Sequence, residues 1–360
     1  MRSLSLPKPL QSSWRVLKQL ATVRPAEPKT TIGLDMGSSA VKVVVLGART
    51  ASGARPLIGQ RMVVLPDGTE PQMASIVKEA ISGFALPVKS VNVSVSGQSV
   101  IMRVIEMPTL APHELAQALP FEAQRYLPFN IQDVVLDGTI LGPAEGKKLH
   151  VLIVACKRDL LERRLAWVTE AGFEPAVIDV DALALANAWI EHAIVQAPSD
   201  PMGVPGQADA QTCAVINVGA QWTNLAILKA GHPFLVRDIP WGATKLIRHI
   251  AEQLGRQDAQ VAASLAAPQD APLATELLDA AKQACESLTT DLQLSFDFFE
   301  NNFGTTPAQL AVSGGLSRCP GFVEALKSHL TQPLALWEPL EGLTSQFAVA
   351  YGLALRRARP

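Results

Sequence analysis

Cysteine and histidine are scarce in this sequence, and neither is arranged as a set of metal ligands. The four cysteines are isolated from one another, and the six histidines include no HExxH pair. The sequence therefore contains no metal-binding motif of these types. Reduced, buried thiols are expected at Cys156, Cys213, Cys285 and Cys319.

Long apolar runs are also missing. No run reaches the roughly 18 residues that a membrane-spanning helix needs, and the first residues lack the unbroken apolar core of a signal peptide. We therefore expect a cytoplasmic protein. A formal net charge of −2 argues against a broad nucleic-acid-binding surface. A hydrophobic content of 48% in 360 residues allows two or three domains with sizeable cores.

Residues 1–30 form a basic segment ahead of the first predicted strand. Six Lys and Arg residues accompany a single acid, Glu27. Four apolar residues recur at helical spacing, namely Leu10, Trp14, Leu17 and Leu20. The segment is either an amphipathic helix on an anionic membrane or partner, a loose tail, or a helix docked on the body of the protein.

A hairpin with a polar turn is predicted at residues 31–48. Two apolar, β-branched arms flank the turn Gly37-Ser38-Ser39, which favours strands joined by a tight turn. Exposed backbone N–H groups, the two hydroxyls and nearby Lys42 are suited to holding phosphate oxygens. Asp35 would face a metal ion, since two anions in direct contact repel. The alternatives are a turn-capping role for Asp35 and a Lys42 side chain that points away from the turn.

The hairpin pattern returns 182 positions later, at residues 213–230. A duplication with so long a period predicts two similar lobes. Their two turns could hold a polyphosphate from both sides. The corresponding residues are Asp35 and Asn217, Gly37 and Gly219, and Lys42 and Asn224.

A glycine pair follows a third predicted strand within residues 309–321. Gly314 and Gly315 lie between this strand and a helix expected from about Phe322. Because glycine has no side chain, a flat ring can approach the backbone closely at this turn.

The two hairpins and the glycine pair, in this order, resemble the nucleotide site of the actin, Hsp70 and sugar-kinase superfamily. Within it the chain resembles the PilM family of type IV pilus assembly proteins, which is related to FtsA. The resemblance spans residues 31–356 and implies an α/β, actin-like (ribonuclease H-like) two-lobed fold with an inserted FtsA/PilM-type α/β subdomain in the first lobe. Four stretches narrow it to this family: residues 104–108 (VIEMP), 121–129 (FEAQRYLPF), 237–242 (RDIPWG) and 348–355 (AVAYGLAL).

The resemblance and the composition together give an expected division of the chain. Residues 1–30 are a basic tail, 31–97 and 173–197 the first lobe, 98–172 the inserted subdomain, 198–211 an inter-lobe loop rich in Pro and Gly, and 212–360 the second lobe. A helix is predicted at 112–125, where Pro120 is expected to bend it or divide it in two. An apolar cluster follows, of Phe121, Tyr126, Leu127, Pro128 and Phe129. It belongs either to the core or to a partner groove.

The resemblance implies that ATP and Mg²⁺ bind between the lobes. Asp35 would orient Mg²⁺, usually through water, and Asp181 would position the attacking water or act only as a helix N-cap. Asp179 is a weaker candidate for positioning the attacking water. Arg237 and Asp238 are interpreted as a surface ion pair. The further nucleotide contacts implied are Gly37, Ser38, Ser39, Lys42, Asn217, Gly219, Gln221, Gly242, Lys245, Gly314 and Gly315.

Asn217 departs from the superfamily pattern, because the corresponding position is normally Asp. An amide keeps an oxygen but loses the charge, so it holds a hard cation less strongly. Bulky Trp222 also lies where a small residue would crowd phosphate less. These departures predict a site that binds nucleotide and hydrolyses it slowly at most.

The family resemblance implies a place at the cytoplasmic face of the inner membrane. The expected partners are the N-terminal peptide of a PilN-like membrane protein, in a groove between the first lobe and the inserted subdomain, and other pilus assembly proteins. Peripheral membrane association and homo-oligomers are further expectations. The alternatives are an FtsA-like filament-forming division protein, although no amphipathic tail follows the last predicted helix, and a sugar or metabolite kinase, although no general base is evident.

Overall fold

The computed structural model describes residues 30–50, 53–66, 72–84, 89–196, 212–266 and 274–357. The predictions for residues 1–29 and for the inter-lobe loop 198–211 lie outside these ranges. Within the described residues, no helix combines the length and the apolar character needed to cross a membrane.

The first lobe is built on a five-stranded sheet with the order β3-β2-β1-β4-β8. Its first three strands are antiparallel neighbours, and β4 and β8 continue the sheet in parallel. The strands are β1 (Thr31–Met36), β2 (Ala40–Leu46), β3 (Leu57–Val64), β4 (Ser90–Val95) and β8 (Glu174–Val180). Both arms of the predicted hairpin are nearly all buried, which explains their β-branched, apolar composition.

The second lobe repeats this sheet, with the order β11-β10-β9-β12-β13 and the same pattern of directions. Strand β9 begins and ends 182 positions after β1, at the offset that the sequence predicts. The strands are β9 (Cys213–Val218), β10 (Thr223–Lys229), β11 (His232–Ile239), β12 (Gln309–Ser313) and β13 (Leu334–Leu336).

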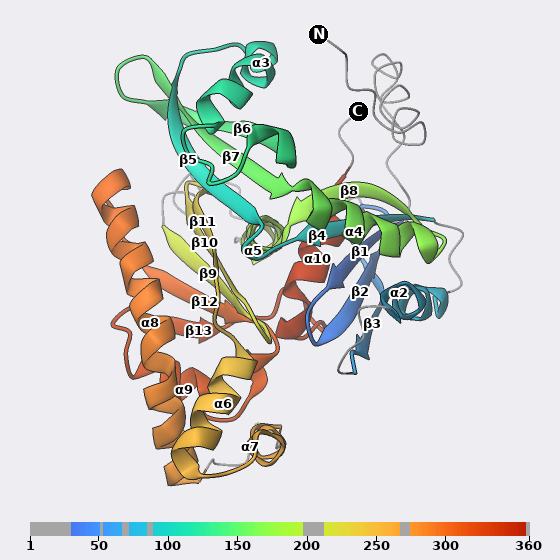
Figure 1. The fold of residues 1–360 in the computed structure, drawn as a ribbon, viewed down its shortest axis with the longest axis vertical. Coiled ribbons are helices and arrows are strands. Elements are labelled where there is room, and N and C mark those ends of the chain that lie inside the picture. The colour runs from blue at the N-terminus through green and yellow to red at the C-terminus, as the bar shows by residue number, and fades with distance from the viewer. Residues whose placement is uncertain are drawn as a thin grey trace.

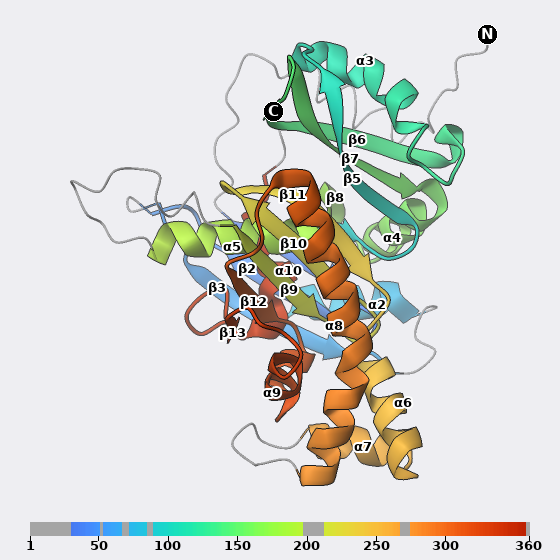
Figure 2. The same ribbon diagram turned by 90° about the vertical axis from the view of Figure 1, so that its left-hand side faces the viewer.

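Among the described residues, four α-helices share one hydrophobic core with the second-lobe sheet, and the longest, α8, covers one face of that sheet (Figure 2). The buried positions of α8 recur every three or four residues, so one stripe faces the strands. Trp241, Phe296, Phe299 and Phe322 are the largest side chains in this core. The helices are α6 (Ala243–Leu254), α7 (Asp258–Leu265), α8 (Thr275–Phe303) and α9 (Phe322–Lys327).

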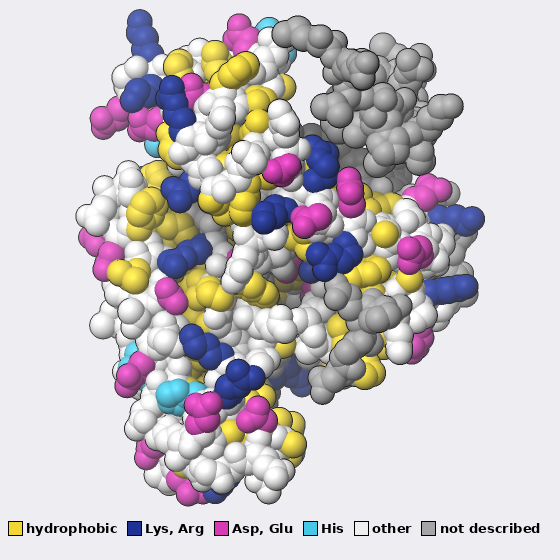
Figure 3. Space-filling model, viewed as in Figure 1, with side chains coloured by type: hydrophobic (Ala, Val, Ile, Leu, Met, Phe, Trp, Pro, Cys, Tyr) yellow, Lys and Arg dark blue, Asp and Glu magenta, His cyan; other side chains and the backbone are white. Residues whose placement is uncertain are grey.

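The inserted subdomain stands above the two lobes in Figure 1. Figure 3 shows an indentation at the left edge of the molecule, between the subdomain and the second lobe below it. It is a three-stranded antiparallel sheet of order β5-β7-β6 with α3 packed on one face. Its elements are β5 (Val100–Pro108), α3 (Pro112–Ala123), β6 (Val134–Ala144) and β7 (Lys148–Lys157). Helix α3 runs through Pro120 as one element, so of the two predicted outcomes a division in two is wrong and a bend stays a prediction. Phe121 is 78% exposed, which excludes it from the core.

Two helices packed on the first sheet differ from the expected division. Helix α4 (Arg158–Glu170), expected in the inserted subdomain, packs with α2 (Met73–Ser82) against the first sheet through Val168. Helix α10 (Ala348–Leu355), expected in the second lobe, lies against β1 and against α5 (Asp181–Gln196). A Cβ on Gly352 would overlap the Ala184 carbonyl, so α10 and α5 meet backbone to backbone. The remaining boundaries stay predictions.

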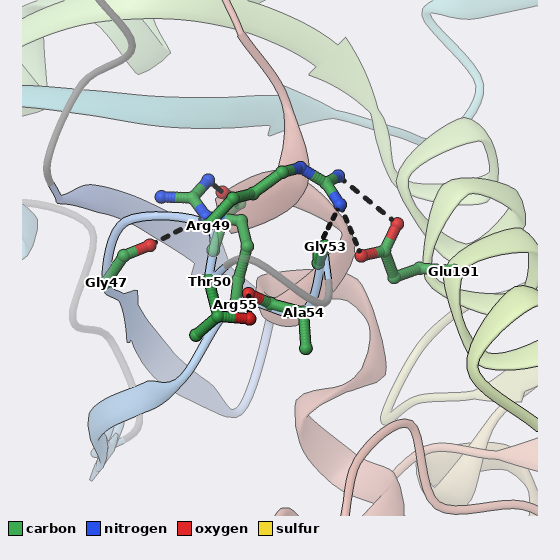
Figure 4. Close-up of polar contacts among 8 residues, drawn as sticks. Gly47, Arg49, Thr50, Gly53, Ala54, Arg55 and Glu191 are labelled. Atoms are coloured by element: carbon green, nitrogen blue, oxygen red, sulfur yellow. Dashed lines mark hydrogen bonds and ion pairs between the residues drawn. The ribbon is translucent and has the colours of Figure 1, made fainter.

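Arginine side chains fasten the loop after β2 to these two helices (Figure 4). Arg49 forms an ion pair of 3.2 Å with Glu191 of α5. Buried Arg55 donates to the Gly47 carbonyl at 2.8 Å and to the Ala354 carbonyl, at the end of α10, at 3.2 Å. A cation at a helix C-terminus is favourable, so Arg55 helps to hold α10 on the first lobe.

All four cysteines are free thiols; Cys156, Cys213 and Cys285 are buried and Cys319 is half-buried. Burial raises the pKa of each thiol, to about 12 at Cys285 and about 11 at the other three. The thiols are therefore protonated at neutral pH and unreactive.

Candidate functional site: the facing hairpins

The first hairpin holds a partly buried ion pair next to its turn. Asp35 and Lys42 are directly opposite in the β1–β2 register, and their side chains meet at 2.9 Å. Lys42 therefore points toward Asp35. The turn is closed by the Gly37 N–H, which donates to the Ala40 carbonyl, and the adjacent Ser38 is exposed. Ser39 is exposed as well, so the turn presents hydroxyls to solvent beside a neutralised carboxylate.

The second hairpin has the same register with neutral side chains. Asn217 lies opposite Asn224, and its Nδ2 donates to the Asn224 Oδ1 at 2.8 Å. The Gly219 N–H closes the turn by donating to the Trp222 carbonyl, and Gln221 is exposed. The amide pair Asn217–Asn224 thus occupies the two positions of the repeat that correspond to the Asp35–Lys42 ion pair of the first hairpin.

A hydrogen-bonded chain leads from this amide pair to the first lobe. Asn224 Nδ2 donates to Asp238 Oδ1 at 2.8 Å, and the Gly97 N–H donates to Asp238 Oδ2 at 2.7 Å. The Trp222 ring packs over Gly97. We call this contact between β11 and the end of β4 the clasp, consisting of Gly97, Trp222 and Asp238. The predicted ion pair of Arg237 with Asp238 is wrong, since Arg237 binds Asp291 at 3.4 Å.

Asp181 is the first residue of α5 and lies close enough to Asp35 and Asp238 for both carboxylates to affect its pKa. Its Oδ1 accepts from the Ser94 hydroxyl at 2.5 Å. Burial, followed by the nearby Asp35 carboxylate, raises the pKa of Asp181 to about 7. Asp238 also raises the pKa, while Arg164 and the Ser94 hydrogen bond lower it. The carboxyl group is therefore poised to exchange a proton near neutral pH.

Asp179 has a different environment. It is buried, and Arg356 binds its Oδ2 at 2.8 Å. Burial raises the pKa of this carboxyl group, although Arg356 and the Val180 N–H act in the opposite direction. The Arg356 pair joins β8 to the residue after α10, which is a structural role.

Arg164 of α4 is a site residue that the sequence analysis missed. Its Nη1 donates to the Met36 carbonyl at 2.6 Å, directly before the first turn. Its buried Nε has no hydrogen-bond partner among the described residues. Nothing in the helical pattern around Arg164 distinguishes it from its exposed neighbour Glu162, so only the tertiary fold reveals it.

The glycine pair and the start of α6 adjoin the second hairpin. Gly314 has a φ of +97°, and a Cβ there would come within 2.6 Å of the Val218 nitrogen, so close packing on β9 requires glycine. Gly315 is exposed, and a Cβ there would meet no atom within 4 Å. Gly242 is buried where α6 begins, and the Ala243 N–H donates to the Gly219 carbonyl at 3.0 Å. Lys245 is exposed on the first turn of α6.

The candidate residues therefore gather in two groups. Asp35, Gly37 and Lys42 lie in the first lobe with Asp181, whereas Asn217, Gly219, Gly242 and Gly314 adjoin one another in the second. Within the described residues, no three His, Cys, Asp or Glu side chains are arranged to hold a metal. Mg²⁺ bound mainly through water and phosphate oxygens needs only one or two carboxylates, and Asp35 can supply one.

Two surface grooves border the inserted subdomain, and the second of them reaches Trp222 of the second turn. The α4 groove, of about 890 Å³, lies between the residues after α3 and the start of α4, and includes Phe129, Gln132, Lys157 and Glu162. The β5 groove, of about 820 Å³, lies between the inserted subdomain and the second lobe and includes residues of β5, β11 and α8.

Comparison with known proteins agrees with this geometry. The family model for the type IV pilus assembly protein PilM matches residues 33–358. The chain belongs to the PilM family of type IV pilus assembly proteins. A PilM–PilN type IV pilus biogenesis complex is similar in structure, with a TM-score of 0.76 and 24% identity over 93% of this chain and all of that one.

A second solved structure shares the fold at lower similarity. The ethanolamine utilization protein EutJ from Carboxydothermus hydrogenoformans has a TM-score of 0.52 and 15% identity over 97% of this chain and 98% of that one. The family resemblance and the two-lobed actin-like fold that the sequence predicts are thus confirmed.

Proposed function

We propose that the chain binds ATP with Mg²⁺ between its two hairpin turns and serves in pilus assembly as a scaffold whose shape depends on nucleotide. One observation carries this proposal. The two lobes present the same hairpin at the same register, with Asp35 and Lys42 in one and Asn217 and Asn224 in the other. Phosphate groups would lie between the turns, with Gly315 open on the side of the base.

The residues suggest roles for each part of the nucleotide. The Ser38 and Ser39 hydroxyls and the turn N–H groups would donate to phosphate oxygens. Lys42 would shift from Asp35 toward phosphate, which frees the Asp35 carboxylate to hold water around Mg²⁺. Bound Mg²⁺ would supply charge neutralisation at the phosphates.

Hydrolysis is proposed to be slow. Asp181, with a pKa of about 7, would accept a proton from an attacking water. Asn217 provides no second negative charge for the metal and is already engaged with Asn224. The site therefore favours holding ATP over consuming it.

A PilN-like peptide is proposed to bind in the α4 groove. This groove lies where the inserted subdomain meets α4, which packs on the first sheet. Its walls offer both apolar and charged groups, including Leu127, Phe129 and Asp159. The Lys157 ammonium lies 4.5 Å from the Phe129 ring centroid and fixes one wall. An extended peptide in such a groove is a common recognition mode.

Isothermal titration with the N-terminal peptide of a PilN-like protein tests this assignment. Gln132→Trp fills the α4 groove and is expected to weaken peptide binding at least tenfold. Asn302→Trp, a matched change of an exposed residue in the β5 groove, is expected to leave the affinity unchanged. The opposite result would move the peptide to the other groove.

The same titration with and without ATP and Mg²⁺ tests the scaffold role. Nucleotide biases the partner only if it binds the two lobe arrangements unequally. We expect ATP to change the peptide affinity, and an unchanged affinity would refute the coupling. Peripheral association with the inner membrane is part of the same proposal, because a PilN-like partner is itself a membrane protein.

A further inference from the structure

The β5 groove follows the free edge of a strand. In the described part of the chain, β5 pairs with β7 on one side and with no strand on the other. An edge strand presents unpaired N–H and C=O groups that can accept another strand. Five consecutive residues of this edge, 100–104, line the groove.

The groove has two walls, and they lie over opposite faces of β5. Residues Arg125–Pro128, after α3, form one wall, and β11 with α8 forms the other. Leu294 and Phe298 lie one helical turn apart on α8 and are 57% and 56% exposed. Tyr126, on the first wall, is 37% exposed. An added strand would point its alternate side chains at these two apolar walls.

Arginines outnumber acids in the lining of the groove. The lining contains Arg103, Arg125 and Arg237 and one acid, Asp238, which the clasp already engages. Arg125 pairs with Glu122 and Arg237 with Asp291, both outside the lining, which leaves the charge of Arg103 to face the groove. Arg103 is exposed and forms no ion pair with any residue that the structure describes. Figure 3 shows hydrophobic and basic side chains beside the indentation between the inserted subdomain and the second lobe.

We propose that the β5 groove is a second docking site, which binds an extended, acidic segment of a partner protein by strand addition to β5. The free edge determines the extended conformation, the walls take alternate apolar side chains, and Arg103 pairs with a carboxylate. Recognition of such a segment requires neither a bound nucleotide nor a peptide in the α4 groove, although movement of the lobes can change its affinity.

The site also shares residues with the clasp. Gly97, Trp222 and Asp238 line the end of the groove and join the first lobe to the second. A change in the relative position of the lobes would therefore alter the width of the groove. Through this contact, occupancy of the β5 groove would depend on the same lobe movement that a ligand between the hairpins would cause.

Fluorescence anisotropy with a defined probe tests the proposal on the full chain. The probe is a labelled, blocked peptide of about eight residues, a typical strand length, with alternating valine and threonine and aspartate at both ends. A peptide with lysine in place of aspartate is the charge control. We expect saturable binding of the acidic probe and at least tenfold weaker binding of the basic one.

Four variants, two of them controls, and two modified probes then locate the binding. Arg103→Glu and Asn302→Trp are each expected to weaken the acidic probe at least tenfold. Arg248→Glu, on the exposed side of α6, and Gln132→Trp, in the α4 groove, are expected to leave it unchanged. N-methylation of alternate residues along one edge of the probe should abolish binding, while N-methylation along the other edge should not. Absence of binding, or equal effects of both N-methylated probes, would overturn the proposal.

Discussion

The Asn217→Asp variant probes the consequence of the missing second carboxylate. In the native protein the Asn217 Nδ2 donates to Asn224 Oδ1 at 2.8 Å, and the Asn224 Nδ2 donates to Asp238 Oδ1 at 2.8 Å. The substitution replaces the first donor by a carboxylate oxygen, so two acceptors face each other. If Asn224 turns its amide round, the conflict moves to Asp238.

The expected loss in the free energy of unfolding follows from this clash of acceptors. One hydrogen bond is lost, at about 1 kcal/mol, and one charged acceptor is left facing another acceptor, at about 1–3 kcal/mol. We therefore expect Asn217→Asp to lower the free energy of unfolding by about 2–4 kcal/mol without nucleotide. Saturating ATP with Mg²⁺ should recover more stability in the variant than in the native protein, since the cation then faces the new carboxylate.

Urea unfolding with and without ATP and Mg²⁺ measures both effects. Asn301→Asp, an exposed change in the last turn of α8, is the control; a negative charge at a helix C-terminus is unfavourable, so it should lower the free energy of unfolding by less than about 1 kcal/mol. A loss below about 0.5 kcal/mol for Asn217→Asp would refute the hydrogen-bonded chain. Equal stabilisation of both proteins by ATP with Mg²⁺ would refute the placement of the cation.

Three further predictions concern the same region. Because the pKa of Asp181 is raised to about 7 in the folded protein, its contribution to stability falls as pH rises from about 4 to 7. Asp181→Asn should therefore lessen the loss of stability between pH 5 and pH 8 in urea unfolding. An unchanged loss would contradict the buried, acidic environment of Asp181. Gly314→Ala should lower the free energy of unfolding by at least about 2 kcal/mol, through its positive φ and its contact with Val218. Gly315→Ala should lower it by under about 0.5 kcal/mol. Equal shifts of the two variants in thermal unfolding would argue against the described turn. Asp238→Ala removes the acceptor of the Gly97 N–H and should raise hydrogen exchange at Gly97 at least tenfold, and unchanged protection would show that the clasp is not formed in solution.

The repeated hairpin could be predicted from the sequence because its signal is local. β-branched arms and a glycine-containing turn specify a hairpin without reference to distant residues, and the recurrence at Asn217 specifies two such units. The same local pattern located Gly314 correctly between a strand and a helical turn.

The features that the sequence did not reveal depend on contacts between distant segments. Helix α10 is apolar on nearly all sides, so no pattern indicates that it packs against β1 and α5. The hydrogen-bond partners of Asp238 lie 14 and 141 positions away in the sequence. Its neighbour Arg237 suggested an ion pair, but successive side chains of a strand point to opposite faces, so the two cannot meet. Phe121 has an apolar side chain but lies on the exposed side of α3.

Titration of ATP into the native protein and into Gly315→Trp, with Mg²⁺ and with chelator, tests the central claim most directly. Gly315 is exposed and unobstructed, so the bulky ring should leave the fold intact while it occupies the proposed place of the base. The account predicts Mg²⁺-dependent binding of one ATP to the native protein, weakened at least tenfold, or about 1.4 kcal/mol, in the variant. Absence of ATP binding, or equal affinity in both proteins, would contradict a nucleotide site between the two hairpins.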